Sequence, residues 1–103
     1  NFSFVPKPNL GSKNPKHNGL VCFGKDLRMT ERLSKIEIKW LIEAYKKYPH
    51  KNKFFKSGFS LLAGTKSLEN QIKNNLSEKE IRQSWQEGLK KFKKIRDKYL
   101  LYP

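Results

Sequence analysis

The chain has 103 residues, a length that suits one domain, and its 36% hydrophobic content allows one modest core. Its 23 basic and 9 acidic side chains give a formal net charge of +14. The single cysteine, Cys22, excludes an internal disulfide and a cysteine-based zinc cluster, and no apolar run approaches the roughly 20 residues that span a bilayer.

The positive charge is spread evenly along the chain. Residues 1–28 carry 5 basic and 1 acidic side chains, residues 29–65 carry 8 and 3, and residues 66–103 carry 10 and 5. Lysine supplies 19 of the 23 basic residues, whereas arginine is the side chain that binds phosphates through two parallel hydrogen bonds. We therefore expect diffuse attraction to polyanions and no specific nucleic-acid partner.

The N-terminal part predicts an extended arm followed by a strand. Pro6, Pro8 and Pro15 remove backbone donors from residues 1–19, so neither a helix nor a central strand fits there. Residues 20–27 form a short apolar run that is rich in β-forming side chains. The sequence therefore predicts a short strand near residues 20–27, preceded by an extended N-terminal arm.

A helix is predicted after this strand. Ser34 and Glu37 have the spacing of a capping box, in which each side chain bonds a backbone N–H of the first turn. Apolar side chains then recur at helical spacing until Pro49 ends the pattern. They are Ile36, Trp40, Leu41, Ala44, Tyr45 and Tyr48.

The C-terminal third predicts two more helices. Thr65 is placed to cap a short helix that ends near Asn75. Ser77 and Glu80 form a second capping box, and the apolar side chains beyond it keep helical spacing to about Lys98. The last two thirds of the chain are therefore expected to be mainly helical.

These elements together predict an α+β fold, a small single domain in which helix dominates. Gly88 costs about 1 kcal/mol relative to Ala inside a helix, so we expect a kink or a break near Trp85. The C-terminal residues 99–103 are expected to form a docked tail or a short terminal strand. The predicted core side chains are Trp40, Tyr45, Leu62, Trp85, Phe92 and Leu100.

Few side chains point to catalysis. A glycoside hydrolase needs two carboxylates roughly 5–9 Å apart on either side of one sugar bond. No convincing pair can be assembled from the sequence, so no catalytic residue is assigned. His17 and His50 lack the spacing of metal ligands, and no glycine-rich phosphate loop is present. Neither a metal nor a cofactor is therefore expected.

Five side chains remain as weak candidates for substrate binding. Asp26 and Arg28 follow the predicted strand, where such a pair is more often a local ion pair. His17 lies in a basic loop, where an exposed histidine is the usual interpretation. Phe54 and Phe55 follow a loop and are placed to line a groove, although aromatic side chains more often belong to a core.

Four blocks of the sequence together resemble one family. They are Asn14-Pro-Lys-His-Asn-Gly19 with Cys22-Phe-Gly-Lys-Asp-Leu-Arg28; Trp40-Leu-Ile-Glu-Ala-Tyr-Lys-Lys-Tyr-Pro49 with Phe54-Phe55; Leu62-Ala-Gly-Thr65 with Leu68 and Ile72; and Ile81-Arg-Gln-Ser-Trp85 through Leu89, Phe92, Arg96 and Tyr99-Leu-Leu-Tyr102. Their order and spacing are similar to the C-terminal region of NamZ-like exo-β-N-acetylmuramidases, bacterial glycoside hydrolases once described only as a domain of unknown function. The resemblance covers nearly the whole chain, and its last block is the most specific.

The resemblance implies a longer parent enzyme whose Rossmann-like N-terminal domain carries the catalytic acid and is absent from this chain. Residues 1–103 would be an accessory C-terminal domain that helps form the muramyl-sugar cleft at the interface with the catalytic domain. It also implies a peptidoglycan-degrading activity in cell-wall recycling and a periplasmic or secreted protein, with any signal peptide on the missing N-terminal part. The isolated chain is expected to be inactive as an enzyme.

Composition leaves two other functions open. A stand-alone basic module that binds anionic cell-wall polymer or nucleic acid would carry the same charge. A purely structural domain would only stabilise its catalytic partner. An upstream reading frame for the Rossmann-like half would favour the muramidase or the structural interpretation over the stand-alone module.

Overall fold

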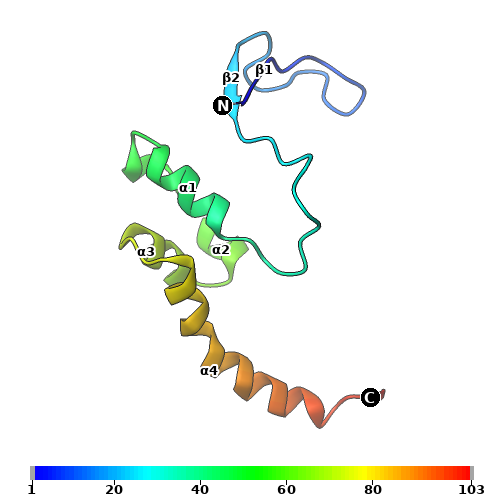
Figure 1. Cartoon of the computed structure of the whole chain (residues 1–103), viewed down its shortest axis with the longest axis vertical. Coiled ribbons are helices and arrows are strands. Elements are labelled where there is room, and N and C mark those ends of the chain that lie inside the picture. The colour runs from blue at the N-terminus through cyan, green and yellow to red at the C-terminus, as the bar shows by residue number, and fades with distance from the viewer. Residues whose placement is uncertain (1, 103) are drawn as a thin grey trace. The chain divides into compact units, whose positions relative to one another are not determined.

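The computed structural model describes residues 2–102 and divides the chain into two units. The first unit runs to Ser34 and the second begins at Lys35. Figure 1 shows that the first unit contains the two strands, β1 and β2, and that the second contains the helices α1 to α4. Strands and helices are therefore segregated along the chain, which confirms the α+β class.

The first unit is built around a two-stranded antiparallel sheet. Strand β1, Phe2–Phe4, pairs with β2, Cys22–Gly24, and Phe4 lies opposite Cys22. The predicted strand near residues 20–27 is confirmed, although the paired part is shorter. None of the side chains of residues 2–34 is buried, so the core of the protein lies in the second unit.

Helix α1 spans Lys39–Lys47 and begins later than the capping box predicts. Ile38 occupies the N-cap position, without a side-chain hydrogen bond, and Ser34 lies outside the helix. Glu37 instead accepts a hydrogen bond from the backbone N–H of Lys39 at 3.3 Å. Because the Ile38 side chain is only 3% exposed, burial in the core decides where α1 starts. The prediction of a helix capped by Ser34 is wrong.

A lysine ammonium group caps the C-terminus of α1. Lys51 Nζ donates hydrogen bonds to the carbonyls of Tyr45, Lys46 and Tyr48 over 2.6, 2.7 and 3.0 Å. The last carbonyls of a helix carry partial negative charge, so a cation there stabilises the helix end. The short 3₁₀ helix Lys51–Lys53 brings this side chain back over the end of α1.

Two short helices follow. Helix α2 spans Phe59–Ala63 and ends at Gly64, whose φ of 86° lies in the left-handed region that glycine adopts without strain. Helix α3 spans Ser67–Lys73. Thr65 Oγ1 accepts a hydrogen bond from the backbone N–H of Ser67 at 3.2 Å, just ahead of the helix. The predicted short helix is therefore confirmed, although Lys66 rather than Thr65 occupies its N-cap and it ends at Lys73 rather than near residue 75.

Helix α4, Glu78–Asp97, begins at the predicted capping box. Ser77 Oγ accepts a hydrogen bond from the Glu80 backbone N–H at 3.2 Å, and Glu80 Oε2 accepts one from the Ser77 N–H at 2.9 Å. The helix runs unbroken through Gly88, so no break occurs near Trp85, and a kink there stays a prediction. A cost of about 1 kcal/mol is too small to interrupt a helix of 20 residues. Within residues 2–102, no helix combines the length and the apolar character needed to cross a bilayer.

The core of the second unit is small. Among residues 2–102, the buried side chains are Ile38, Tyr45, Ile72 and Ile81. Partly buried side chains pack around them: Leu41, Ile42, Phe54, Phe55, Leu68, Leu76 and Trp85. Ile72 and Ile81 bring α3 and α4 to the same cluster as α1, so this cluster joins three of the helices.

The structure corrects half of the predicted core. Tyr45 is buried, and Trp40 and Trp85 are half-buried. Leu62, Phe92 and Leu100 are exposed by 91, 59 and 52%, and Leu101 and Tyr102 are exposed as well. Periodicity identifies an apolar helix face, but it does not show whether a neighbouring element covers that face.

Candidate functional site

Asp26 and Arg28 form a local ion pair just beyond β2. Arg28 donates from Nε to Asp26 Oδ1 over 2.9 Å and from Nη2 to Oδ2 over 2.7 Å. The backbone N–H of Arg28 also donates to Oδ1, over 3.0 Å. These hydrogen bonds from Arg28 lower the pKa of Asp26 from 3.8 to about 2. Asp26 is therefore ionised at neutral pH, and both of its oxygens already accept hydrogen bonds.

His17 lies in a turn of the first unit. It is exposed and has a φ of 59°, and its carbonyl accepts a hydrogen bond from the Leu20 N–H at 3.0 Å. Within residues 2–102, no hydrogen bond or ion pair joins His17 to Asp26 or Arg28. The structure therefore brings together two of the three candidates in this unit.

Phe54 and Phe55 belong to an aromatic cluster beside the core. Their ring centres lie 4.9 Å apart, Phe54 lies 5.4 Å from Tyr45, and Phe55 lies 4.6 Å from Phe59. Both are half-buried, and both line an open apolar groove of about 690 Å³. The groove is lined by Leu41, Phe54, Phe55, Lys56, Ser57, Gly58, Phe59, Leu61 and Leu62. The two rings thus pack against the core and also face a groove.

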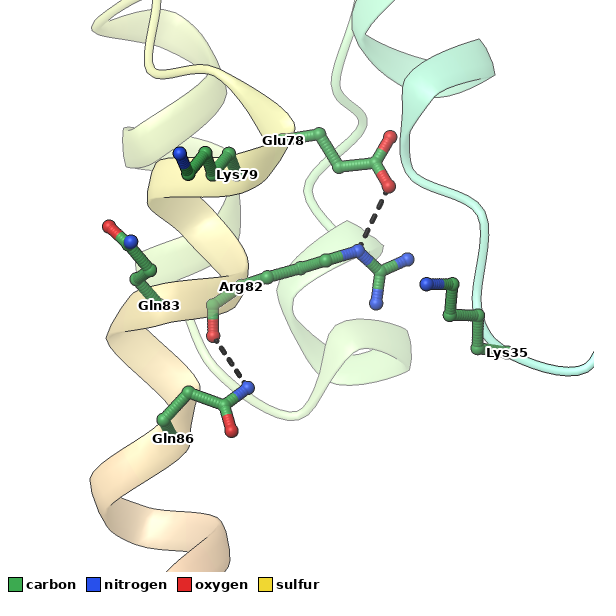
Figure 2. Close-up of a pocket in the computed structure, with 6 residues that line it drawn as sticks. All are labelled: Lys35, Glu78, Lys79, Arg82, Gln83 and Gln86. Atoms are coloured by element: carbon green, nitrogen blue, oxygen red, sulfur yellow. Dashed lines mark hydrogen bonds and ion pairs between the residues drawn. The ribbon is translucent and has the colours of Figure 1, made fainter.

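A polar pocket of about 510 Å³ lies beside the N-terminal half of α4. Figure 2 shows the side chains that line it: Lys35, Glu78, Lys79, Arg82, Gln83 and Gln86. In this view the Lys35 ammonium group points toward the Arg82 guanidinium group. Three cationic side chains and one carboxylate line the pocket, so its net charge is positive. Such a pocket suits an anionic group, which charge-assisted hydrogen bonds would hold.

Arg82 is held in place by three contacts. Its Nε donates to Glu78 Oε1 over 2.9 Å, and its Nη2 donates to the carbonyl of Ile36. Its guanidinium carbon also lies 5.9 Å from the centre of the Trp85 ring. The hydrogen bond from Arg82 is the main cause of the lowered pKa of Glu78, and the Glu37 side chain adds to it. Arg82 therefore ties the chain ahead of α1 to α4 and also presents charge to the pocket.

Asp26 and Glu78 do not have the properties of a glycosidase acid. Such an acid usually sits in an apolar environment that raises its pKa, so that it holds a proton near neutral pH. Among residues 2–102 no charged side chain is buried. The pKa values of Asp26 and Glu78 are shifted downward by arginine partners. Neither carboxyl group is therefore suited to protonate a leaving group.

The part of the chain that the structure describes also lacks a metal site. No group of three or more histidine, cysteine, aspartate or glutamate side chains within residues 2–102 converges as metal ligands would. Cys22 is a free, half-buried thiol in β2.

The sequence analysis missed the polar pocket. Its residues on α4 follow the spacing of one helix side, and the four-residue spacing of Glu78 and Arg82 is a signal of an ion pair. Lys35 and Ile36 lie more than 40 residues earlier in the chain. No local pattern predicts that they reach α4, so only the folded structure shows the pocket.

Three comparisons place the chain among known proteins. A model of the family described as "Exo-beta-N-acetylmuramidase NamZ, C-terminal" matches residues 1–102. The peptidoglycan β-N-acetylmuramidase NamZ of Bacillus subtilis strain 168 is 34% identical over 92 residues, which are 84% of this chain and 22% of that protein. A crystal structure of a DUF1343 family protein from Bacteroides fragilis is 33% identical and superposes with a TM-score of 0.82. It covers 99% of this chain and 30% of that one.

The match covers nearly all of this chain but only a small part of each relative. It spans about a fifth (22%) of the Bacillus subtilis relative and 30% of the solved Bacteroides fragilis chain. The similarity therefore concerns one domain of longer proteins. With a family match over residues 1–102 and a fold shared at 33% identity, the chain belongs to the family of NamZ C-terminal domains.

Proposed function

We propose that this chain is the non-catalytic C-terminal domain of a peptidoglycan-degrading exo-β-N-acetylmuramidase and that it contributes to the binding of muramyl sugars. The observation that carries this proposal is the family match, which extends over residues 1–102. The absence of buried charged side chains among residues 2–102 supports a role in binding rather than in the hydrolytic step. The catalytic carboxylates would lie on an N-terminal catalytic domain of the same enzyme.

The polar pocket beside α4 is the part of this chain whose chemistry fits such a ligand. N-acetylmuramic acid differs from N-acetylglucosamine by a lactyl ether that ends in a carboxylate. Lys35 and Arg82 offer cationic donors to that carboxylate, and Gln83 and Gln86 offer amides to sugar hydroxyls. Within residues 2–102 no hydrogen bond or ion pair engages the Lys35 side chain, so its donors are open to a ligand.

The proposed substrate also sets the expected location. Peptidoglycan lies outside the cytoplasmic membrane, so the proposal carries with it a periplasmic or secreted enzyme. The isolated chain is expected to leave a chromogenic N-acetylmuramic acid glycoside intact. Turnover that disappears in an Asp26→Asn variant would show instead that this chain carries catalytic machinery.

A ligand titration followed by NMR tests the pocket. N-acetylmuramic acid is expected to shift the signals of Lys35, Arg82 and Gln86, while N-acetylglucosamine, which lacks the carboxylate, should shift them much less. Lys35→Ala should weaken binding roughly two- to fivefold, the usual effect of losing one exposed charge pair. Lys90→Ala, on α4 but outside the pocket, is the matched control. Equal shifts with both sugars, or none at the pocket, would rule the pocket out.

A further inference from the structure

One face of α4 is buried in its N-terminal half and exposed in its C-terminal half. Ile81 is 0% exposed, but Leu89, Phe92 and Ile95, spaced three or four residues apart along the helix, are exposed by 45, 59 and 54%. Spacing of this kind places these side chains along one side of the helix. Figure 1 shows the reason for the change, because the C-terminal half of α4 runs on past the other helices of its unit.

We infer that this exposed face is a docking surface for the larger remaining part of a NamZ-type muramidase. The face, here called the α4 stripe, consists of Gly88, Leu89, Phe92 and Ile95. The inference rests on the proposed function and adds to it the surface by which this domain meets its partner. A helix face that is apolar over about two turns and about half exposed is characteristic of a surface that another element covers.

The extent of the family match argues for this occupant. The chain corresponds to 22% of the Bacillus subtilis relative and to 30% of the solved Bacteroides fragilis chain. In both proteins most of the polypeptide therefore lies outside the matched domain. A small core of four buried side chains beside so long an apolar face fits a domain that completes its burial against another part of the same protein.

The charges beside the stripe define the chemistry of the partner surface. Lys91, Lys93 and Arg96 border the stripe, whereas Lys90 and Lys94 and the two acidic residues of this stretch, Glu87 and Asp97, lie toward the opposite side of the helix. The partner surface is therefore apolar at its centre and acidic at its rim. A second copy of this chain is disfavoured as the occupant, because it would bring the same lysines together.

Gly88 leaves room for another backbone to approach the stripe closely. It lies inside an unbroken helix, and a Cβ atom built there would meet nothing within 4 Å. In the interior of a helix only proline is less favourable than glycine, so Gly88 does not stabilise α4. A glycine on the stripe lets the backbone of a docked partner approach closely. Gly88→Gln should therefore strengthen α4 and weaken docking.

Cysteine reactivity tests the inference. In a Cys22→Ser background, Phe92→Cys and the flanking Lys93→Cys are placed in this chain and in a chimaera, the Bacillus subtilis NamZ whose matched segment is replaced by this chain. Both cysteines should react readily with N-ethylmaleimide in the 103-residue chain. In the chimaera, Phe92→Cys should react at least about tenfold more slowly, while Lys93→Cys changes little. Gly88→Gln should restore the reactivity of Phe92→Cys in the chimaera and raise the thermal midpoint of the isolated chain.

Several results would overturn the inference. If Phe92→Cys is already protected in the isolated chain, the stripe is covered within this chain. If it reacts equally fast in both proteins, the remaining part of the muramidase does not cover it. Light scattering and vesicle sedimentation examine the isolated chain directly, without need of the chimaera. Dimerisation, or binding to anionic vesicles, that Phe92→Glu abolishes would assign the stripe to a second copy or to a membrane.

The inference and the proposed function can fail separately. The sugar titration reports on Lys35, Arg82 and Gln86, none of which belongs to the α4 stripe. Protection of Phe92→Cys without sugar binding would leave the docking surface standing and remove the pocket. Sugar binding without protection would keep the pocket and remove the docking surface.

Discussion

At the scale of single residues, arginine side chains set the behaviour of the acidic groups. Arg28 binds both oxygens of Asp26, and Arg82 binds Glu78 while its other nitrogen reaches the carbonyl of Ile36. The first pair is contained within three consecutive residues, so the sequence predicts it. The second pair includes the hydrogen bond from Arg82 to the Ile36 carbonyl, and no local sequence pattern predicts that contact.

The Asp26 pair predicts a specific titration. The Asp26 carboxyl group, followed by carbon-detected NMR, should titrate near pH 2, and its pKa should rise toward 3.8 in an Arg28→Ala variant, which keeps only the backbone hydrogen bond from residue 28. Because the pKa is lowered in the folded chain, any stability from the pair is present above about pH 3.8 and is lost as the pH falls toward 2. Arg32→Ala serves as the control and should leave the titration unchanged. An unchanged pKa in Arg28→Ala would show that Arg28 is not the cause.

At the scale of elements, two capping-box patterns of the same sequence type differ in whether they start a helix. Ser34 and Glu37 match Ser77 and Glu80 in type and spacing, yet only the second pair caps a helix. The chain bends at Ser34 and Lys35, and the helix starts only where Ile38 is buried in the core. A capping box therefore shows where a helix is able to start, and core burial decides whether it does.

This difference predicts unequal effects of the same substitution. Ser77→Ala should lower the free energy of unfolding by about 1 kcal/mol, because the Glu80 backbone N–H at the start of α4 loses Ser77 Oγ as its acceptor. Ser34→Ala should change it by less than about 0.5 kcal/mol. Urea unfolding of both variants measures the two values. Equal losses would mean that both capping boxes form.

Substitutions in the two halves of α4 are expected to change the free energy of unfolding by different amounts. Ile81→Ala should cost about 2–5 kcal/mol, because the side chain is 0% exposed in the core. Phe92→Ala should cost less than about 0.5 kcal/mol in the isolated chain, because its ring is 59% exposed. Unfolding by urea again provides the measurement. A loss of several kcal/mol for Phe92→Ala would place the ring in a core, as its helical spacing suggests.

At the scale of the whole molecule, the net charge of +14 dominates interactions with polyanions. The charge is carried mostly by lysine and is distributed over the entire chain. Within residues 2–102 no charged side chain is buried, so salt screens these charges easily. This charge attracts nucleic acid without providing a means to read its sequence.

The expected binding to DNA follows from this. Affinity should fall at least about tenfold between roughly 50 and 200 mM salt, because binding by diffuse charge is driven by the release of counterions. Duplexes of different sequence should bind alike, which fluorescence anisotropy measures directly. N-acetylmuramic acid binding, held by a few hydrogen bonds in a pocket, should depend less on salt. DNA binding that survives about 200 mM salt and distinguishes sequences would favour a nucleic-acid function instead.

Local patterns in the sequence were sufficient to determine a large part of this protein. The strand β2, the capped start of α4, the α+β class and the family were all predicted correctly. Each depends on residues a few positions apart or on the order of short motifs, and such information is contained in the linear chain. The sugar-binding roles of His17, Asp26, Arg28, Phe54 and Phe55 stay predictions.

Tertiary structure alone decided which apolar faces are covered. Phe92 and Ile81 have the same helical spacing, but only Ile81 meets other helices, because α4 is longer than its neighbours. The start of α1 at Ile38 and the hydrogen bond from Arg82 to Ile36 likewise depend on segments that lie far apart in the chain. Burial depends on which distant segments meet, and periodicity along one segment carries no information about them.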